Sequence, residues 1–153
     1  MDNQNFTTSI LVDQTPEEVF DAIKNVRGWW SGVIEGETDK PGAEFTYRSS
    51  DVHTSKQKIT EFIPVKKIAW HVIDSHISFV KDKSEWKDTD IVFEIFKKED
   101  KTEVRFTHIG LVPAFECYKD CSNVWGLLIN RNLRGLITTG KVQPGRGRED
   151  RVM

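Results

Sequence analysis

The stretch "RFTHIGLVPAFECYKDCSNVWGLLINRNLRGL" at residues 105–136 decides the fold, because it joins a strand pattern to a long helix pattern. Val104, Phe106 and His108 alternate with polar residues, which indicates a strand with one apolar face that ends in a histidine. A Gly/Pro turn follows, and apolar residues then recur at helical spacing over about residues 115–139. The sequence therefore predicts a strand followed by one long amphipathic C-terminal helix.

Upstream of this stretch, residues 43–109 alternate between apolar and polar side chains with a period of two. The pattern predicts strands in "EFTYR", "SKQKITEFI", "KKIAWHVI", "DIVFEIFKK" and "TEVRFTHI", with a tight turn at Pro64. A sheet whose other face is polar is typical of antiparallel strands that are solvated on one side. The apolar face needs a cover, and only the C-terminal helix is long enough to provide it.

The N-terminal part predicts a strand at residues 6–12 and a helix that begins after Thr15. Thr15 can cap this helix, Pro16 suits its first position, and Glu18 completes a capping box. The order of elements is then strand, short helices, antiparallel meander and long helix. It indicates an α+β fold.

The segment "NVRGWWSG" at residues 25–32 predicts a short second helix or turn that ends at Gly32. If it is helical, Trp29 and Trp30 point about 100° apart, so at least one of them lies near the surface. We expect this segment to act as a lid.

Length and composition describe one soluble globular domain. The chain has 153 residues, with 37% hydrophobic and 30% charged side chains and a formal net charge of −2. This charge gives no reason to expect a nucleic-acid partner, and no apolar run reaches the length of a membrane span. We expect a domain at residues 1–139, a flexible Gly/Pro-rich tail at 140–153 and, without a signal-peptide pattern, a cytoplasmic location.

Three stretches in this order resemble a known family: "TPEEVFDAI", the following "WW", and "FTHIGL" before an aromatic-containing helix. They are similar to homologues of the activator of heat shock protein 90 ATPase, within the START/Bet v-like (SRPBCC) superfamily. The resemblance covers about residues 6–139. It implies a helix-grip fold, with a seven-stranded sheet around the last helix and a cavity between them. It also implies the binding of apolar small molecules, and in a minority of members an aromatase/cyclase activity.

The predicted interior carries large rings and a few polar side chains. The residues expected to line it and to bind ligand are Trp29, Trp30, Phe45, Tyr47, Trp70, Phe93, Phe106, His108, Trp125, Leu128 and Asn132. His108 is either satisfied by backbone or a nearby turn, or a polar anchor for ligand, or a general base. Asn132 either bonds a facing side chain such as Tyr47 or His108, or lines a cavity. This mixture of rings and few polar groups is typical of a small-molecule pocket.

Other candidate sites are weaker. Cys117 and Cys121 share a helix face but lack two further ligands for a metal, so we expect half-buried thiols and no metal or cofactor. His71 and His76 point to opposite faces of a strand, which favours surface residues over a cluster.

Motifs of hydrolases and nucleotide-binding enzymes are absent, which favours a binding protein over an enzyme. The sequence therefore predicts binding of a hydrophobic or amphipathic small molecule between the sheet and the last helix. Two alternatives stay open. One is an aromatase/cyclase-like enzyme that uses the same cavity. The other is a protein-interaction module, such as a chaperone partner, that uses a strand edge or the arginine-bearing tail.

Overall fold

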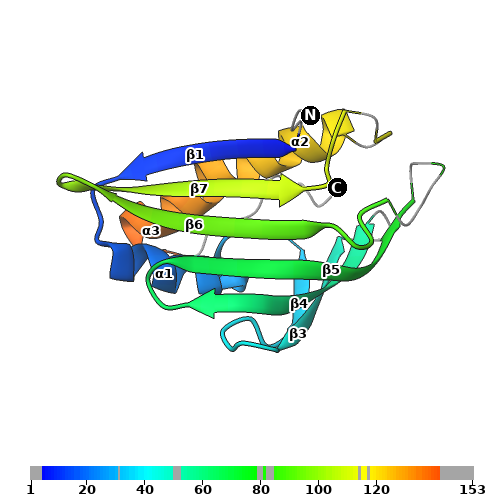
Figure 1. The fold of residues 1–153 in the computed structure, drawn as a ribbon, viewed down its shortest axis with the longest axis horizontal. Helices are drawn as coiled ribbons and strands as arrows, with labels where there is room; N and C mark the ends of the chain where they lie inside the picture. The colour runs from blue at the N-terminus through cyan, green and yellow to red at the C-terminus, as the bar shows by residue number, and fades with distance from the viewer. Residues whose placement is uncertain are drawn as a thin grey trace.

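A seven-stranded antiparallel sheet curves over a long C-terminal helix (Figure 1). The computed structural model describes residues 5–30, 32–49, 53–78, 81, 85–113, 115–116 and 118–141. The strands follow the order β1-β7-β6-β5-β4-β3-β2. Their bounds are β1 Phe6–Val12, β2 Val33–Gly36, β3 Glu44–Ser49, β4 His53–Ile63, β5 Lys67–Ile77, β6 Asp90–Lys98 and β7 Lys101–Ile109. This is the α+β helix-grip arrangement expected from the sequence.

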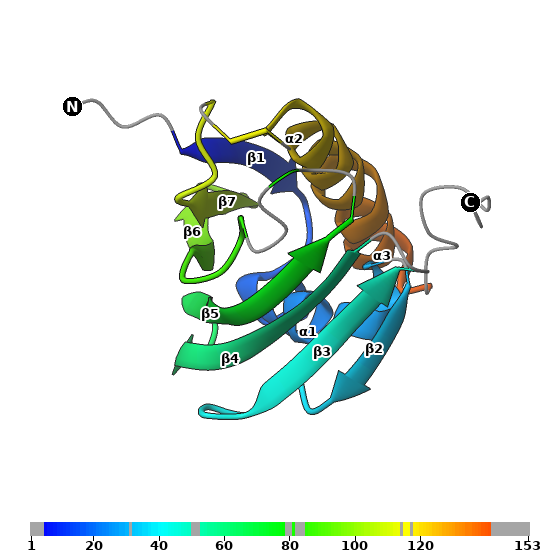
Figure 2. The same cartoon turned by 90° about the vertical axis from the view of Figure 1, so that its right-hand side faces the viewer.

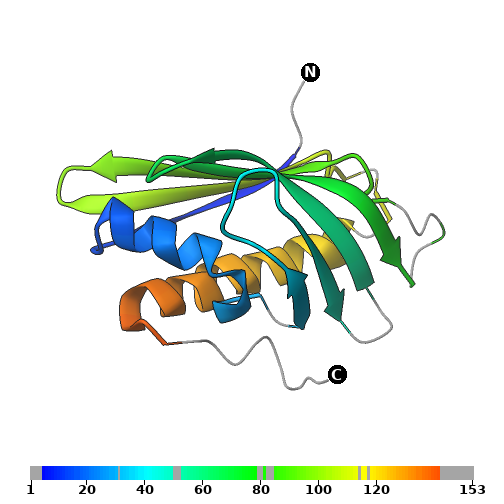
Figure 3. The ribbon, with the colours of Figure 1, turned by 90° about the horizontal axis from the view of Figure 1, so that it is seen from below.

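All helices lie on the concave side of the sheet (Figure 3). They are α1 Pro16–Lys24, the 3₁₀ turn η1 Val26–Gly28, and a continuous C-terminal run of α2 Tyr118–Leu127, the π-helical η2 Leu128–Leu133 and α3 Arg134–Thr139. Viewed from the end, the sheet curls around this run so that the inner faces of distant strands point towards the same helix (Figure 2). The interior between sheet and helix is thus the place where a ligand site would form.

Local signals set the limits of several elements. Thr15 accepts from the Glu18 backbone N–H while the Glu18 carboxylate accepts from that of Thr15, so the predicted capping box begins α1. At the other end Gly140 adopts a φ of 74° and its N–H bonds the Leu136 carbonyl, which ends α3. The first predicted strand agrees with β1, and Pro64 lies in the turn between β4 and β5.

Two expectations for the helices were wrong. Trp29 and Trp30 are both buried, at 1% and 3% exposure, because the helical turn ends at Gly28 and both rings turn inward. The C-terminal helix begins at Tyr118, not near Phe115, and contains a π turn. Sequence periodicity does not reveal such a turn, because one added residue shifts the pattern only slightly.

Cys117 and the tail beyond residue 141 lie outside the described residues, whereas Cys121 is a buried free thiol. The described residues hold no group of histidine, cysteine and carboxylate side chains arranged for a metal ion. None of the helices among them is both long and apolar enough to cross a membrane.

Candidate functional site

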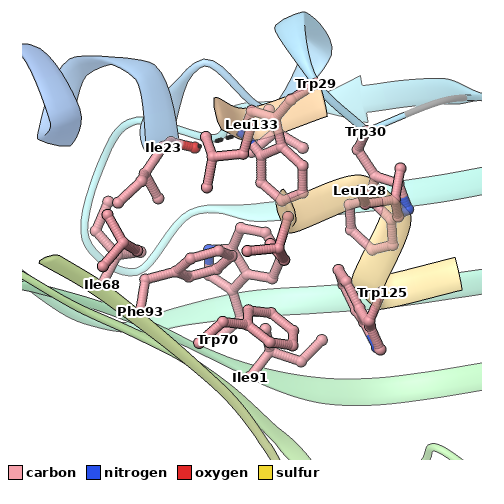
Figure 4. Close-up of a cluster of buried hydrophobic side chains, with 14 of the residues drawn as sticks. Ile23, Trp29, Trp30, Ile68, Trp70, Ile91, Phe93, Trp125, Leu128 and Leu133 are labelled. Atoms are coloured by element: carbon pink, nitrogen blue, oxygen red, sulfur yellow. Dashed lines mark hydrogen bonds between the residues drawn. The ribbon is translucent and has the colours of Figure 1, made fainter. Parts of the chain in front are cut away.

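The interior is filled by aromatic rings from both layers. All five tryptophans of the chain are buried there, and they contact one another in a chain of rings. Trp30 from the segment after η1 stacks on Trp70 of β5 at 5.8 Å between ring centroids and lies 5.2 Å from Trp125 of α2. Figure 4 shows the rings of Trp29 and Trp30 from the segment after η1, Trp70 from the sheet and Trp125 from the C-terminal helix gathered in one cluster. An interior of this kind offers flat apolar surfaces for stacking.

The structure brings together the residues that the sequence predicts to line the interior. Each of them is buried, with at most 3% of its surface exposed: Trp29, Trp30, Phe45, Tyr47, Trp70, Phe93, Phe106, His108, Trp125, Leu128 and Asn132. The strand residues in this set occupy alternate positions on the inner face, as the period of two requires. The polar members of this set, His108 and Asn132, differ from the rings in that each makes hydrogen bonds to other elements.

Trp86 belongs to the same interior although sequence reasoning missed it. It lies in the turn that precedes β6, yet its indole is buried and stacks on Trp125 at 5.7 Å. It also makes edge contacts with His108 at 4.7 Å and His53 at 4.3 Å. The surrounding "KDKSEWKDTD" is polar and has no apolar period, so only the identity of the residue could have signalled burial.

His108 is held by hydrogen bonds on both ring nitrogens. The Trp125 indole N–H donates to His108 Nδ1 at 3.1 Å, which leaves Nε2 as the protonated nitrogen, and this N–H lies 2.8 Å from Thr89 Oγ1. Thr89 in turn donates to the Trp86 carbonyl at 2.6 Å. Burial lowers the pKa of His108 to about 3, and repulsion from His53 contributes. His108 is therefore neutral, and no ring nitrogen is left over for a ligand or for proton transfer.

Asn132 is also engaged within the protein, but not with the partners that we expected. Its side-chain N–H donates to the Trp29 carbonyl at 3.1 Å, and its carbonyl oxygen accepts from Arg131 Nε at 3.2 Å. Neither Tyr47 nor His108 bonds it. Asn132 thus fixes η2 against the segment that carries Trp29 and Trp30.

A different group of buried polar atoms has no hydrogen-bond partner in the described part of the chain. The group comprises Ser55 Oγ, both amide atoms of Gln57, Trp70 Nε1, Ser75 Oγ and Trp86 Nε1. A buried donor or acceptor left without a partner costs about 1–3 kcal/mol. Several such atoms together are a large fraction of the roughly 5–15 kcal/mol by which a typical domain is stable. These atoms are therefore the polar groups of the interior whose hydrogen-bonding capacity the described part of the chain leaves unused.

No described residue contributes a buried aspartate, glutamate, lysine or arginine to this interior. Its buried polar side chains are uncharged: serine, threonine, glutamine and asparagine, with the neutral His108. The chemistry available is thus hydrogen bonding and ring stacking, without a fixed charge.

The outer face of the sheet carries a separate ionisable cluster. His71 Nδ1 lies 2.8 Å from Asp90 Oδ1, and its Nε2 lies 3.3 Å from Asp88 Oδ1. The bond to Asp90, followed by that to Asp88, raises the pKa of His71 above its ordinary value of 6.5. His71 lies on the face opposite Trp70, so it cannot reach the interior. The expectation that His71 and His76 lie on opposite faces was wrong, because the register shift in β5 between them reverses the alternation and places both on the outer face.

We expect Thr89→Val to lower the free energy of unfolding by about 1–3 kcal/mol, because His108 loses the acceptor for its N–H while it remains buried. Thr89→Ser keeps the hydroxyl and should retain most of the stability. Urea denaturation followed by tryptophan fluorescence measures both. Thr107→Val, which removes an exposed hydroxyl pair on the neighbouring strand, is the matched control. Equal effects of the Thr89 and Thr107 changes would contradict the proposed role of Thr89.

We expect the NMR titration of His71 to give a pKa above 6.5, and Asp90→Asn to lower that pKa. Because the folded pKa is raised, the pair contributes its full stability below pH 6.5 and loses it as pH rises through the folded value. Asp100→Asn, in the distant turn between β6 and β7, should leave the titration unchanged. A pKa of His71 that does not respond to Asp90→Asn would refute the pairing.

Comparisons with known proteins agree with the fold. A family model described as "Activator of Hsp90 ATPase homolog 1-like protein" matches residues 13–138. The Aha1 dimer from Colwellia psychrerythraea superposes with a TM-score of 0.71 at 24% identity, covering 90% of this chain and 98% of that one. No curated protein matches the sequence.

Two further solved structures have the same fold at lower sequence identity. DynU16, of the dynemicin biosynthetic locus, has a TM-score of 0.68 at 13% identity, covering 92% of this chain and 49% of that one. CalU16 from Micromonospora echinospora has a TM-score of 0.63 at 12% identity, covering 87% and 74%. At these identities the likeness establishes a shared fold.

Proposed function

The chain belongs to the Activator of Hsp90 ATPase homolog 1-like family, and from this premise we propose that it binds a hydrophobic or amphipathic small molecule between the curved sheet and the C-terminal helix. One observation carries the proposal. The interior combines stacked aromatic rings with buried polar atoms that have no partner in the described residues. Mostly apolar walls with few convergent polar groups are the usual composition of a ligand site.

The proposed site is lined by the buried residues named above together with Trp86. The rings would cover the apolar body of the ligand, at about 25 cal/mol for each Å² removed from water. Trp86 is the natural cover of the site, because it reaches the interior from a turn and not from a strand. The same arrangement argues against His108 as a general base, since both of its nitrogens are already bonded.

The first test is native mass spectrometry of the protein as purified, beside the same sample denatured. We expect a mass excess that disappears on denaturation, and its value would identify the ligand class. In parallel, the neutral probe N-phenyl-1-naphthylamine should bind with a stoichiometry of one and accept energy from the buried tryptophans. A bare chain mass together with no probe binding up to the solubility limit would refute the proposal.

A second candidate function is self-association through the β1 edge. A groove of about 510 Å³ runs between β1 and α2, where Thr8 and Asn130 line it. Leu127 borders this groove and is 43% exposed. The solved Aha1 relative is described as a dimer. These features favour a second copy of the chain as the partner of this edge.

Sedimentation velocity at micromolar concentration tests this candidate. We expect a dimer for the unmodified chain and a monomer for Leu127→Asp, since a charge in an apolar contact is strongly unfavourable. Ile63→Asp alters a residue of similar exposure, 44%, at the distant end of β4 and should leave the dimer intact. A monomeric unmodified chain would rule this candidate out.

A further inference from the structure

We infer that Gln57 is the polar anchor of the proposed ligand, with Ser55 and Ser75 beside it, and that the ligand is an uncharged aromatic molecule whose rim carries a donor next to an acceptor. A lactam, a primary or secondary amide or a phenol has this chemistry. The inference rests on the proposed function and specifies the ligand class for the same interior.

The inner face of β4 forms a polar track through an otherwise apolar wall. His53, Ser55 and Gln57 occupy alternate positions of the strand and lead inward from its first residue. Most inner positions of β5, β6 and β7, which follow β4 across the sheet, are instead aliphatic or aromatic. A row of polar side chains on the buried face of a central strand weakens the core unless those groups serve a partner.

Gln57 occupies the innermost polar position of the track. It pairs with Phe45 of β3 on one side and with Val72 of β5 on the other, so neither neighbour can hydrogen-bond it through a side chain. Its exposure is 0%, and neither its amide N–H₂ nor its carbonyl oxygen has a partner in the described chain. The primary amide of Gln57 therefore presents a free donor beside a free acceptor. A ligand group with an acceptor next to a donor can form both hydrogen bonds with it.

Ser55 and Ser75 extend the same polar patch by one row. They are directly paired across β4 and β5, with exposures of 1% and 8%, and neither hydroxyl has a partner among the described residues. A register shift between Lys56 and Gln57 creates a bulge here, which brings Val72 opposite Gln57 and keeps Ser75 opposite Ser55. The two hydroxyls can donate or accept, so they complement the amide without adding charge.

The other interior polar groups cannot take this role. His108 is bonded to Trp125 and Thr89, and Asn132 is bonded to the Trp29 carbonyl. Beside the Gln57 patch, the indole N–H of Trp70 is also without a partner. Trp70 of β5 pairs with Ile59 of β4, which is the next inner position of that strand after Gln57. Most of the unpartnered buried polar atoms of the described chain thus lie on β4 and β5; the others are Trp86 Nε1, Gln14 Oε1 and Ser122 Oγ.

The composition of the interior also excludes a ligand with a charged head group. The buried side chains of the described chain include no lysine, arginine, aspartate or glutamate, so an ionised ligand group would lose its hydration without gaining a counter-charge. The apolar surface beside Gln57 is aromatic, because Phe45 and Trp70 pack edge to face there with ring centroids 4.9 Å apart, and such rings favour an aromatic partner. The absence of buried charge therefore selects a neutral molecule, and the ring surfaces favour an aromatic one.

The test compares three bicyclic probes by ligand-observed NMR and calorimetry: 2-quinolinone, a neutral lactam; naphthalene, which has no polar group; and 2-naphthoate, an anion. For the unmodified chain we expect 2-quinolinone to bind most tightly and 2-naphthoate to bind at least about tenfold more weakly. Gln57→Leu should raise the Kd for 2-quinolinone by about tenfold and change the Kd for naphthalene by less than about twofold. Gln14→Leu is the matched control, because Gln14 Oε1 is another buried atom without a partner, at the end of β1 and outside the patch.

The outcomes distinguish the proposed binding function from the proposed role of Gln57. If none of the probes binds the unmodified chain, the proposed function fails. If the probes bind but Gln57→Leu leaves 2-quinolinone unaffected, or weakens all three equally, the anchor is overturned and the binding function stands. Gln57→Leu removes an unpartnered polar group, so we expect its thermal midpoint not to fall. Should it fail to fold, Ser75→Ala is the smaller change, and an effect on 2-quinolinone but not on naphthalene supports the patch.

Discussion

The hydrogen bond from the Trp125 indole to His108 joins the C-terminal helix to the inner face of the sheet, and much of the interior depends on it. Both groups are fully buried, so neither could find water if the other moved. His108 passes the constraint on to Thr89, whose hydroxyl bonds the Trp86 carbonyl. Helix, sheet and the turn before β6 are therefore held in one network. This network places Trp125 between Trp86 and Trp30, and so sets the spacing of the ring cluster.

A second tether fixes the helix further along. Asn132 of η2 bonds the Trp29 carbonyl, and the wide π turn that contains it lies directly after α2. Wide turns of this kind are rare and often occur at functional sites. Here the turn carries one of the two tethers, Asn132, and begins at Leu128, directly after the helix α2 that carries the other, Trp125. It also carries Leu128, which lies beside the rings in the interior (Figure 4). A helix held at two points offers a rigid wall, against which a ligand could be oriented.

Sequence reasoning predicted those parts of the fold in which local chemistry and periodicity agree. The capping box at Thr15, the limits of β1 and the inward positions of Phe93 and Phe106 follow from residue type and spacing alone. Trp86 could not be predicted, because its burial depends on contacts with distant strands and not on its polar neighbours. The partners of His108 and Asn132 are likewise set by tertiary structure. Gln57 did leave a signal: the first half of its strand, from His53 to Lys58, is polar on both faces, which is unusual for a strand that covers a core.

His108 and Gln57 are both buried polar side chains of the interior, but only His108 is hydrogen-bonded within the described chain. On β7 the buried polar group is neutral and fully bonded, so it strengthens the packing of helix, turn and sheet without attracting a ligand. On β4, separated from β7 by β5 and β6, the buried amide has no partner in the described chain. Apolar contact alone discriminates weakly, by about 1–3 kcal/mol for a methylene, whereas an unpaired buried polar group rejects every molecule that cannot pair with it. In the proposed site, stability would thus depend on one part of the sheet and ligand selectivity on another, because the bonded His108 and the unpartnered Gln57 lie on strands that are two strands apart.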